Sequence, residues 1–381
     1  MANAIDYLDW RGDVPLSLDG FNEVDGLIVS KLTSLDFTDI VPADGGMPLA
    51  DALAAYFERR GDKDVRLGVL LPAGTVTMAK KMLEAKRFEG MVIYDYINHI
   101  DDSNAEQFCA LTASLPDGTR FVAFRGTDDT ITAWREDFNM SAHDAVPAQM
   151  DAAAYLTRAG WRFDGRLRVG GHSKGGNLSV FAAMNAPEEL QERLIDVFNF
   201  DGPGFRESVR ALPGYQRIRG KIRMVVPQYA MVGVLLTNDA DYEIIESSET
   251  GTSAHNGFTW QVLGTRFVRR DKFSLRTRVY TEAIRAWADK LDLQQRQDLI
   301  NAVFDSLEST GARTLTDLTE QRVRKALTAA RDLLSDEDER ALFTESMELL
   351  ARSYISSARK NLPIISRFQR RRGRDGDAEN T

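Results

Sequence analysis

The stretch RVGGHSKGGNLSVF constrains the fold more than any other part of the chain. It contains Gly171-His172-Ser173-Lys174-Gly175, which matches the pattern G-x-S-x-G between an apolar strand and a helix-forming segment. This pattern predicts a sharp turn from the strand into the helix. Gly171 and Gly175 lie where larger side chains would collide with the strand and the helix.

The predicted turn has a chemical consequence for Ser173. It would lift the serine hydroxyl out of the backbone and place it at the positive end of the following helix. A hydroxyl in that position can act as a nucleophile when a base lies next to it. A glycine-rich turn without chemistry is the alternative interpretation, because the motif is short.

The chain contains four histidines, so the base can be sought by elimination. In proteins with this turn the order along the chain is serine, acid, histidine. His99 and His143 precede Ser173, and the side chain of His172 is expected to point away from the hydroxyl. His255, in a polar loop that contains glycine, is therefore the predicted base, and a solvent-exposed loop histidine is the alternative.

The acid is less constrained than the base. Asp201 follows the apolar run VFNF, at the end of a predicted strand where ligands gather in open α/β sheets. The later run KIRMVVPQ ends without a carboxylate, and Asp239 and Asp241 come shortly after it. We predict that Asp201 orients His255. A turn-capping role for Asp201 and a serine–histidine pair without an acid remain alternatives.

A negatively charged intermediate would need backbone N–H donors beside the serine. One predicted donor is the amide of Lys174, directly after the nucleophile. The other is the amide of Thr127 in AFRGTDDT, where Arg125 can hold the loop through a carboxylate. A plain turn at the end of a strand is the alternative, and residues 128–147 are the candidate for a lid.

The distribution of apolar residues predicts the domain organisation. From about residue 90, short apolar runs alternate with helical segments, which is typical of an α/β fold with a mostly parallel sheet flanked by helices. Residues 1–275 are predicted to form this domain, with a helical N-terminal extension. Residues 276–362 are predicted to form a helical subdomain, and residues 363–381 a disordered basic and polar tail.

Composition and charge indicate which kinds of partner and which cellular location to expect. A net charge of -9 argues against a broad nucleic-acid-binding surface. The acidic N-terminus lacks the pattern of a signal peptide, and no apolar run reaches the roughly 18 residues of a membrane span. With a single cysteine, Cys109, these features predict a cytoplasmic protein without an integral membrane segment. The arginines of residues 367–374 are compatible with peripheral lipid contact or with a solvated tail.

Cofactor signatures are missing from the sequence. There is no metal-ligand spacing, no phosphate-binding loop and no dinucleotide fingerprint. We therefore expect neither a metal nor a cofactor, and the sequence does not predict the oligomeric state.

The order of these motifs resembles that of class 3 lipases. AFRGT, Trp134, Asp137, GGHSKGG and a late histidine follow one another over roughly residues 90–262. The segments DYLDWRGD, FNEVDGL and HNGFTWQV resemble a bacterial family related to those lipases. The resemblance implies an α/β-hydrolase fold and hydrolysis of an acylglycerol, lysophospholipid or other acyl ester. It carries over Thr127, Ser173, Lys174 and His255 as site residues.

Two departures from the lipase pattern matter. Class 3 lipases carry Asp-x-Val-Pro after the later strand, where this chain has Ala230-Met231-Val232-Gly233. Lys174 replaces an apolar residue after the nucleophile. The acid missing at Ala230 keeps open a rival interpretation, in which the protein retains the fold without catalysis and binds a partner instead.

Overall fold

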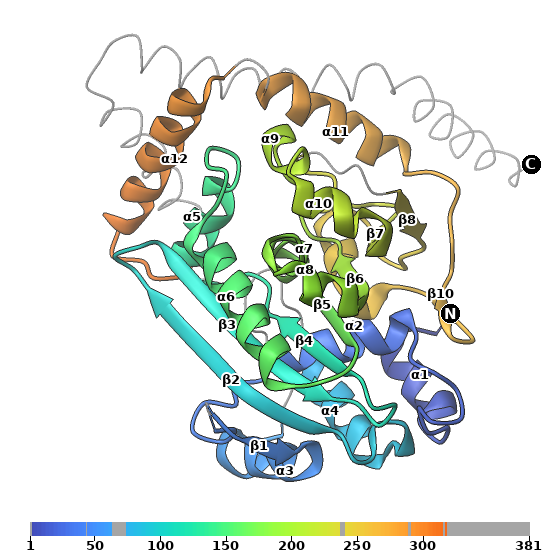
Figure 1. Ribbon diagram of the computed structural model, residues 1–381. Coiled ribbons are helices and arrows are strands. Elements are labelled where there is room, and N and C mark those ends of the chain that lie inside the picture. Colours follow the sequence, from blue (N-terminus) through green and yellow to red (C-terminus); the bar gives the residue numbers. More distant parts are fainter. Residues whose placement is uncertain are drawn as a thin grey trace, which may run out of the picture.

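The computed structural model describes residues 2–42, 44–62, 74–236, 241–288, 291–314 and 317. Its centre is an eight-stranded sheet whose strand order in space equals the order along the chain (Figure 1). The strands of this sheet are β1 (Gly46–Pro48), β2 (Val92–Asp101), β3 (Glu106–Ser114), β4 (Arg120–Phe124), β5 (Leu167–His172), β6 (Leu194–Phe200), β7 (Ile222–Pro227) and β8 (Tyr242–Ile245).

The sheet changes its direction of pairing at β4. Strands β1 to β4 pair antiparallel, and β4 to β8 pair parallel. The hairpin between β3 and β4 turns at Gly118, whose φ of 82° is favourable only for glycine. The predicted α/β architecture with a mostly parallel sheet is confirmed. A separate short pair, β9 (Val262–Leu263) and β10 (Arg266–Phe267), follows the large sheet.

Alternating side chains give the sheet two apolar faces. In β4, Phe121 and Ala123 belong to one core, and Val122 and Phe124 belong to the other. Helices cover both faces, as the buried parallel strands require. The first face is covered by α1 (Ala4–Arg11), α2 (Glu23–Lys31), α3 (Leu49–Arg60) and α4 (Thr75–Glu84). The second is covered by α6 (Pro147–Arg162), α7 (Lys174–Asn185), α8 (Glu188–Arg193), α9 (Glu207–Arg210) and α10 (Pro213–Ile218).

Helix α2 is an integral part of the first helical layer. It packs on β5, and every one of its residues is buried. The side chain of Asn22 accepts hydrogen bonds from the first-turn amides and so defines where the helix begins. Asp25 on α2 forms a fully buried ion pair with Arg87, with Nη2 and Oδ2 2.6 Å apart. The N-terminal helices thus form one of the two helical layers of the α/β architecture.

Two helices follow the sheet at the C-terminal end of the described chain, and the second of them packs against the lid candidate. The structure contains α11 (Leu275–Ala288) and α12 (Leu293–Glu308), and α12 lies beside α5 (Ile131–Asn139) in Figure 1. Residues 318–381, which comprise the rest of the predicted helical subdomain and the predicted tail at 363–381, lie outside the described residues. Within the described part of the chain, no helix combines the length and apolar character that a membrane crossing requires.

Candidate active site

The turn between β5 and α7 has the sharp geometry that the motif predicts. Ser173 adopts φ 60° and ψ -133°, a conformation that is rare and costly for a residue with a Cβ atom. Its amide donates to the carbonyl of Phe200 on β6 over 2.9 Å, and its own carbonyl accepts from Gly176. No hydrogen bond joins the Ser173 hydroxyl to any described residue.

The glycines around the serine are required by close backbone contacts. A Cβ atom on Gly171 would lie 2.3 Å from the carbonyl carbon of Gly175. A Cβ atom on Gly175 would lie 2.2 Å from the carbonyl oxygen of Phe124, at the end of β4. Both distances are far below van der Waals contact. The two glycines therefore let β4, β5 and α7 converge on Ser173.

His255 and Asp201 form a buried pair at the end of β6, the strand next to the one that leads into Ser173. Asp201 directly follows β6, and His255 ends the short 3-10 helix η4 (Gly251–His255). Nδ1 of His255 lies 2.6 Å from Oδ2 of Asp201, and the amide of Gly233 donates to Oδ1 of Asp201 over 3.0 Å. Burial raises the pKa of Asp201, and the neighbouring His255 opposes that rise.

The second ring nitrogen of His255 is free. An ionised Asp201 carboxylate can only accept, so this contact favours the tautomer of the imidazole that carries its proton on Nδ1. Nε2 is then an acceptor. It is buried and has no hydrogen-bond partner among the residues that the structure describes. The geometry therefore provides an oriented imidazole with an unused basic nitrogen.

His172 contacts His255, which its position in the motif did not predict. Its Nε2 lies 2.7 Å from the carbonyl oxygen of His255, and the two rings are 4.5 Å apart between centroids. A carbonyl only accepts, so His172 is the donor. Burial, followed by nearby Lys31 and His255, lowers the pKa of His172 well below its usual range. A neutral His172 therefore supports the backbone at His255.

The loop after β4 lies against the serine. A Cβ atom on Gly126 would come within 2.9 Å of the Cβ atom of Ser173. Arg125 fixes the start of this loop through Asn98 at 3.0 Å and Asp128 at 3.3 Å, as expected for an arginine that pairs with a carboxylate. The amide of Thr127 and that of the residue after Ser173 have no acceptor within the described structure.

The hydroxyl of Thr127 connects this loop to α5. It donates to Oδ2 of Asp137, whose Oδ1 is buried without a partner among the described residues. Burial raises the pKa of Asp137 to about 7, although Lys174 and the Thr127 hydroxyl favour the ionised form. Asp137 was part of the lipase-like pattern, but only the folded structure reveals its contact with Thr127.

The side chain of Lys174 has a structural partner. Its Nζ lies 2.9 Å from Oε2 of Glu136 on α5 and 2.9 Å from the carbonyl of Gln107 on β3. The Glu136 carboxylate also accepts from the amides of Gln107 and Ala148, so the buried charges are compensated. Lysine at this position therefore anchors the start of α7 and leaves the Lys174 amide unused.

The other predicted features lie as follows. Asp241 is exposed, Asp239 lies outside the described residues, and Ala230 is buried. The segment that carries Ala230 contributes the Gly233 amide to Asp201 instead of a carboxylate. In the lid candidate, Phe138 packs against Phe304 of α12 with ring centroids 5.5 Å apart.

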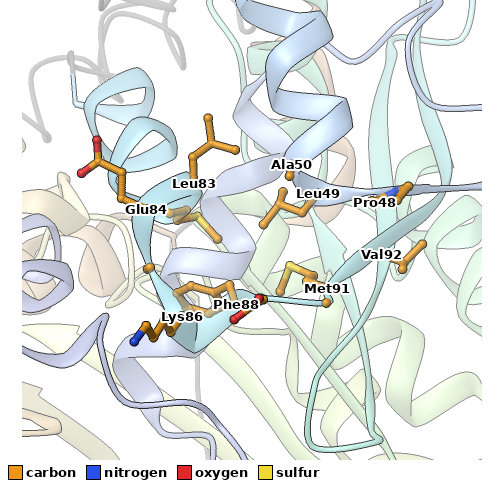
Figure 2. A pocket seen from close by; sticks show the side chains of 13 residues that line it. Pro48, Leu49, Ala50, Leu83, Glu84, Lys86, Phe88, Met91 and Val92 are labelled. Atoms are coloured by element: carbon orange, nitrogen blue, oxygen red, sulfur yellow. The ribbon is translucent and has the colours of Figure 1, made fainter.

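A separate hollow opens between α3, α4 and the start of β2. Its volume is about 540 Å³, and Leu49, Leu83, Phe88 and Met91 are among the residues that line it (Figure 2). None of the predicted site residues contributes to its wall. The hollow therefore belongs to a different part of the molecule from the Ser173 region.

Comparison with known proteins identifies the family. Residues 82–305 match the model of the Mbeg1-like family. The matched range covers more than half of the chain and contains the β5–α7 turn, Asp201 and His255. Comparisons with curated proteins and with solved structures find no match. The chain belongs to the Mbeg1-like family.

Proposed function

We propose that the protein is a serine hydrolase of the α/β-hydrolase type that cleaves carboxylic esters. The observation that carries this proposal is the 2.6 Å contact between Asp201 and His255, together with an Nε2 of His255 that has no partner among the described residues. Ser173 is the nucleophile, His255 the base and Asp201 the group that orients it. The amides of Thr127 and Lys174 stabilise the oxyanion.

The reaction proceeds through an acyl-enzyme. The oxygen of Ser173 attacks the ester carbonyl while Nε2 of His255 takes the hydroxyl proton. The carbonyl oxygen becomes negatively charged and accepts from the amides of Thr127 and Lys174. The carbon–oxygen bond to the alcohol then breaks, and His255 gives its proton to the leaving alcohol. Water, deprotonated by the same imidazole, releases the acid and restores Ser173.

The family supports an acyl ester as substrate. The Mbeg1-like family is described as lipase-like, and the oxyanion loop and serine turn of this chain resemble those of class 3 lipases. Phe138, which follows Asp137 on α5, packs against Phe304 but stays half-exposed, and it offers apolar surface for an acyl chain. We therefore favour acylglycerols, lysophospholipids or related acyl esters.

Turnover of p-nitrophenyl acyl esters tests the assignment of the acid. Asp201→Asn should lower kcat by about 10⁴-fold, because an amide no longer holds the imidazole in the productive tautomer. Asp241→Asn is the matched control, with the same chemical change at an exposed carboxylate, and should leave kcat near that of the wild type. Undiminished turnover in Asp201→Asn would exclude Asp201 as the orienting acid.

A non-catalytic binding protein is the second candidate. The observation that favours it is Ala230, at the position where class 3 lipases carry the acid. A wild-type protein that is folded by circular dichroism, yet hydrolyses no ester across a panel of acyl-chain lengths, would support this candidate over the hydrolase.

A further inference from the structure

Three side chains with metal-binding atoms meet at a place that the proposed hydrolase does not use. His99 on β2, Glu106 on β3 and Asp151 on α6 place one ligand atom each within 4.8 Å of the others. Nε2 of His99 lies 3.1 Å from Oε1 of Glu106 and 3.6 Å from Oδ2 of Asp151. Imidazole and carboxylate together form a donor set suited to a transition metal.

The fold brings these residues together from three elements. In the β2–β3 ladder His99 pairs with Phe108, and Asp101 pairs with Glu106. Residues 99 and 106 therefore project from the same face of the hairpin. Helix α6 packs on that face of β3 and presents Asp151 to it. The three ligands are thus held by regular elements and not by mobile loops.

The spacing of the atoms fits a common ion. Bonds of about 2.0 Å in tetrahedral geometry separate neighbouring ligand atoms by about 3.3 Å. The two separations from His99, 3.1 Å and 3.6 Å, lie on either side of that value, and the Glu106 and Asp151 ligand atoms lie within 4.8 Å of each other. Two adjacent carboxylates also repel one another, and a divalent cation between them would neutralise their charge.

We propose that His99, Glu106 and Asp151 bind a divalent transition-metal ion of the zinc type. The side chain of Glu106 is largely buried, while those of His99 and Asp151 are 42% and 46% exposed. Solvent therefore has access to a fourth position for a water ligand. Ca²⁺ and Mg²⁺ fit poorly, because both prefer sets of oxygen ligands without imidazole.

The ion would brace two elements that also support the serine turn. Glu106 precedes Gln107, whose amide and carbonyl contact Glu136 and Lys174. Glu136 also accepts from the amide of Ala148, one turn before Asp151 on α6. A metal that joins Glu106 to Asp151 would therefore add a link between β3 and α6 to the Glu136 bridge and to the direct contact of Thr112 with Tyr155, and its role is structural.

Metal titration of the full chain tests this proposal. The protein is stripped with a chelator, dialysed and titrated with Co²⁺, whose visible absorption reports tetrahedral coordination, and Zn²⁺ is then added as competitor. Saturable binding with displacement by Zn²⁺ is expected. His99→Ala and Asp151→Asn should each weaken the affinity for Zn²⁺ by more than about tenfold. Excess Zn²⁺ should raise the Tm of the wild type more than that of either variant.

Matched variants separate this site from other surface groups. His143→Ala removes an exposed histidine on the segment between α5 and α6 and should leave the affinity unchanged, as should Ser173→Ala. If His99→Ala fails to fold, Asp151→Asn still provides the test, because it changes charge and not size on a half-exposed side chain. Absence of saturable binding by the wild type, or equal affinity in Asp151→Asn, would overturn the proposal.

Discussion

Ser173 occupies a backbone conformation that glycine adopts more easily than serine. With φ 60° and ψ -133°, the residue carries strain that persists only because its surroundings enforce it. The bond from its amide to Phe200 and the packing of Gly171 against Gly175 provide that enforcement. A strained residue with an unbonded hydroxyl at the end of a central strand is typical of a site where stability is given up for chemistry.

Replacing Ser173 with glycine should therefore stabilise the fold. We expect Ser173→Gly to exceed Ser173→Ala in free energy of unfolding by about 1–2 kcal/mol, as relief of strain outweighs the greater chain entropy of glycine. Alanine is the matched control, because it removes the hydroxyl and keeps the strain. Urea unfolding of the two variants measures the difference, and equal midpoints would show that the turn is not strained.

Asp137 makes the free energy of unfolding depend on pH. The pKa of Asp137 is about 7 in the folded protein, above the ordinary value of 3.8. Between these two pH values the folded state therefore binds more protons than the unfolded state. Its contribution to stability is complete below about pH 4 and is lost as the pH rises through about 7.

Asp137→Asn removes this dependence. The free energy of unfolding of the variant, relative to wild type, should rise with pH by at most about 1.4 kcal/mol per unit between pH 4 and 7. Loss of the contact with Thr127 shifts the free energy of unfolding of the variant by a constant amount at every pH and does not change this slope. Urea unfolding at several pH values provides the measurement, and parallel curves would contradict a raised pKa.

At the scale of elements, the proposed site depends on close contact between the loop after β4 and the turn from β5 into α7. The loop after β4 meets the β5–α7 turn at Gly126, where a Cβ atom would lie 2.6 Å from the carbonyl oxygen of His172 and 2.9 Å from the Cβ atom of Ser173. Neither contact involves the flexible end of a side chain. The loop that carries Thr127 would therefore have to move away from the serine.

Gly126→Ala should accordingly impair the reaction more than a glycine replacement elsewhere. We expect ester turnover to fall by at least about tenfold, because a small displacement of an oxyanion donor is costly. Gly20→Ala is the control, since a Cβ atom there meets nothing within 4 Å. Similar turnover in the two variants would show that the β4 loop does not contribute to the reaction.

The sequence allows the strands and helices around the proposed site to be predicted, but not which of its side chains contact one another. Apolar runs predict β2 to β7 and the helix after Ser173, since each buries a continuous stripe of side chains. β1 and β8 span 3 and 4 residues and are too short to show a period. The position of Asp201 at a strand end favours it over Asp239 and Asp241, but its contact with His255 depends on where the loop with His255 folds back, which the sequence does not show. The proposed metal ligands likewise lie on three different elements and leave no spacing in the sequence.

In the whole molecule, the proposed active site draws on both helical layers and on the ends of the parallel strands between them. The loops after β4, β5 and β6 contribute Thr127, Ser173 and Asp201 at one end of the parallel strands, where ligands gather in such sheets (Figure 1). Lys31 of α2 lies close enough to His172 to lower its pKa, so the N-terminal layer also influences the site. The match to the Mbeg1-like family begins only at residue 82, after the first helices.

Mass spectrometry of the protein after treatment with a fluorophosphonate tests the central claim most directly. We expect one covalent adduct, located on Ser173 in the peptide map, and strongly reduced labelling in His255→Ala, because the hydroxyl then lacks its base. His143→Ala controls for the loss of a histidine elsewhere and should be labelled like the wild type. A folded wild type that remains unlabelled, or an adduct on any other residue, would contradict the account.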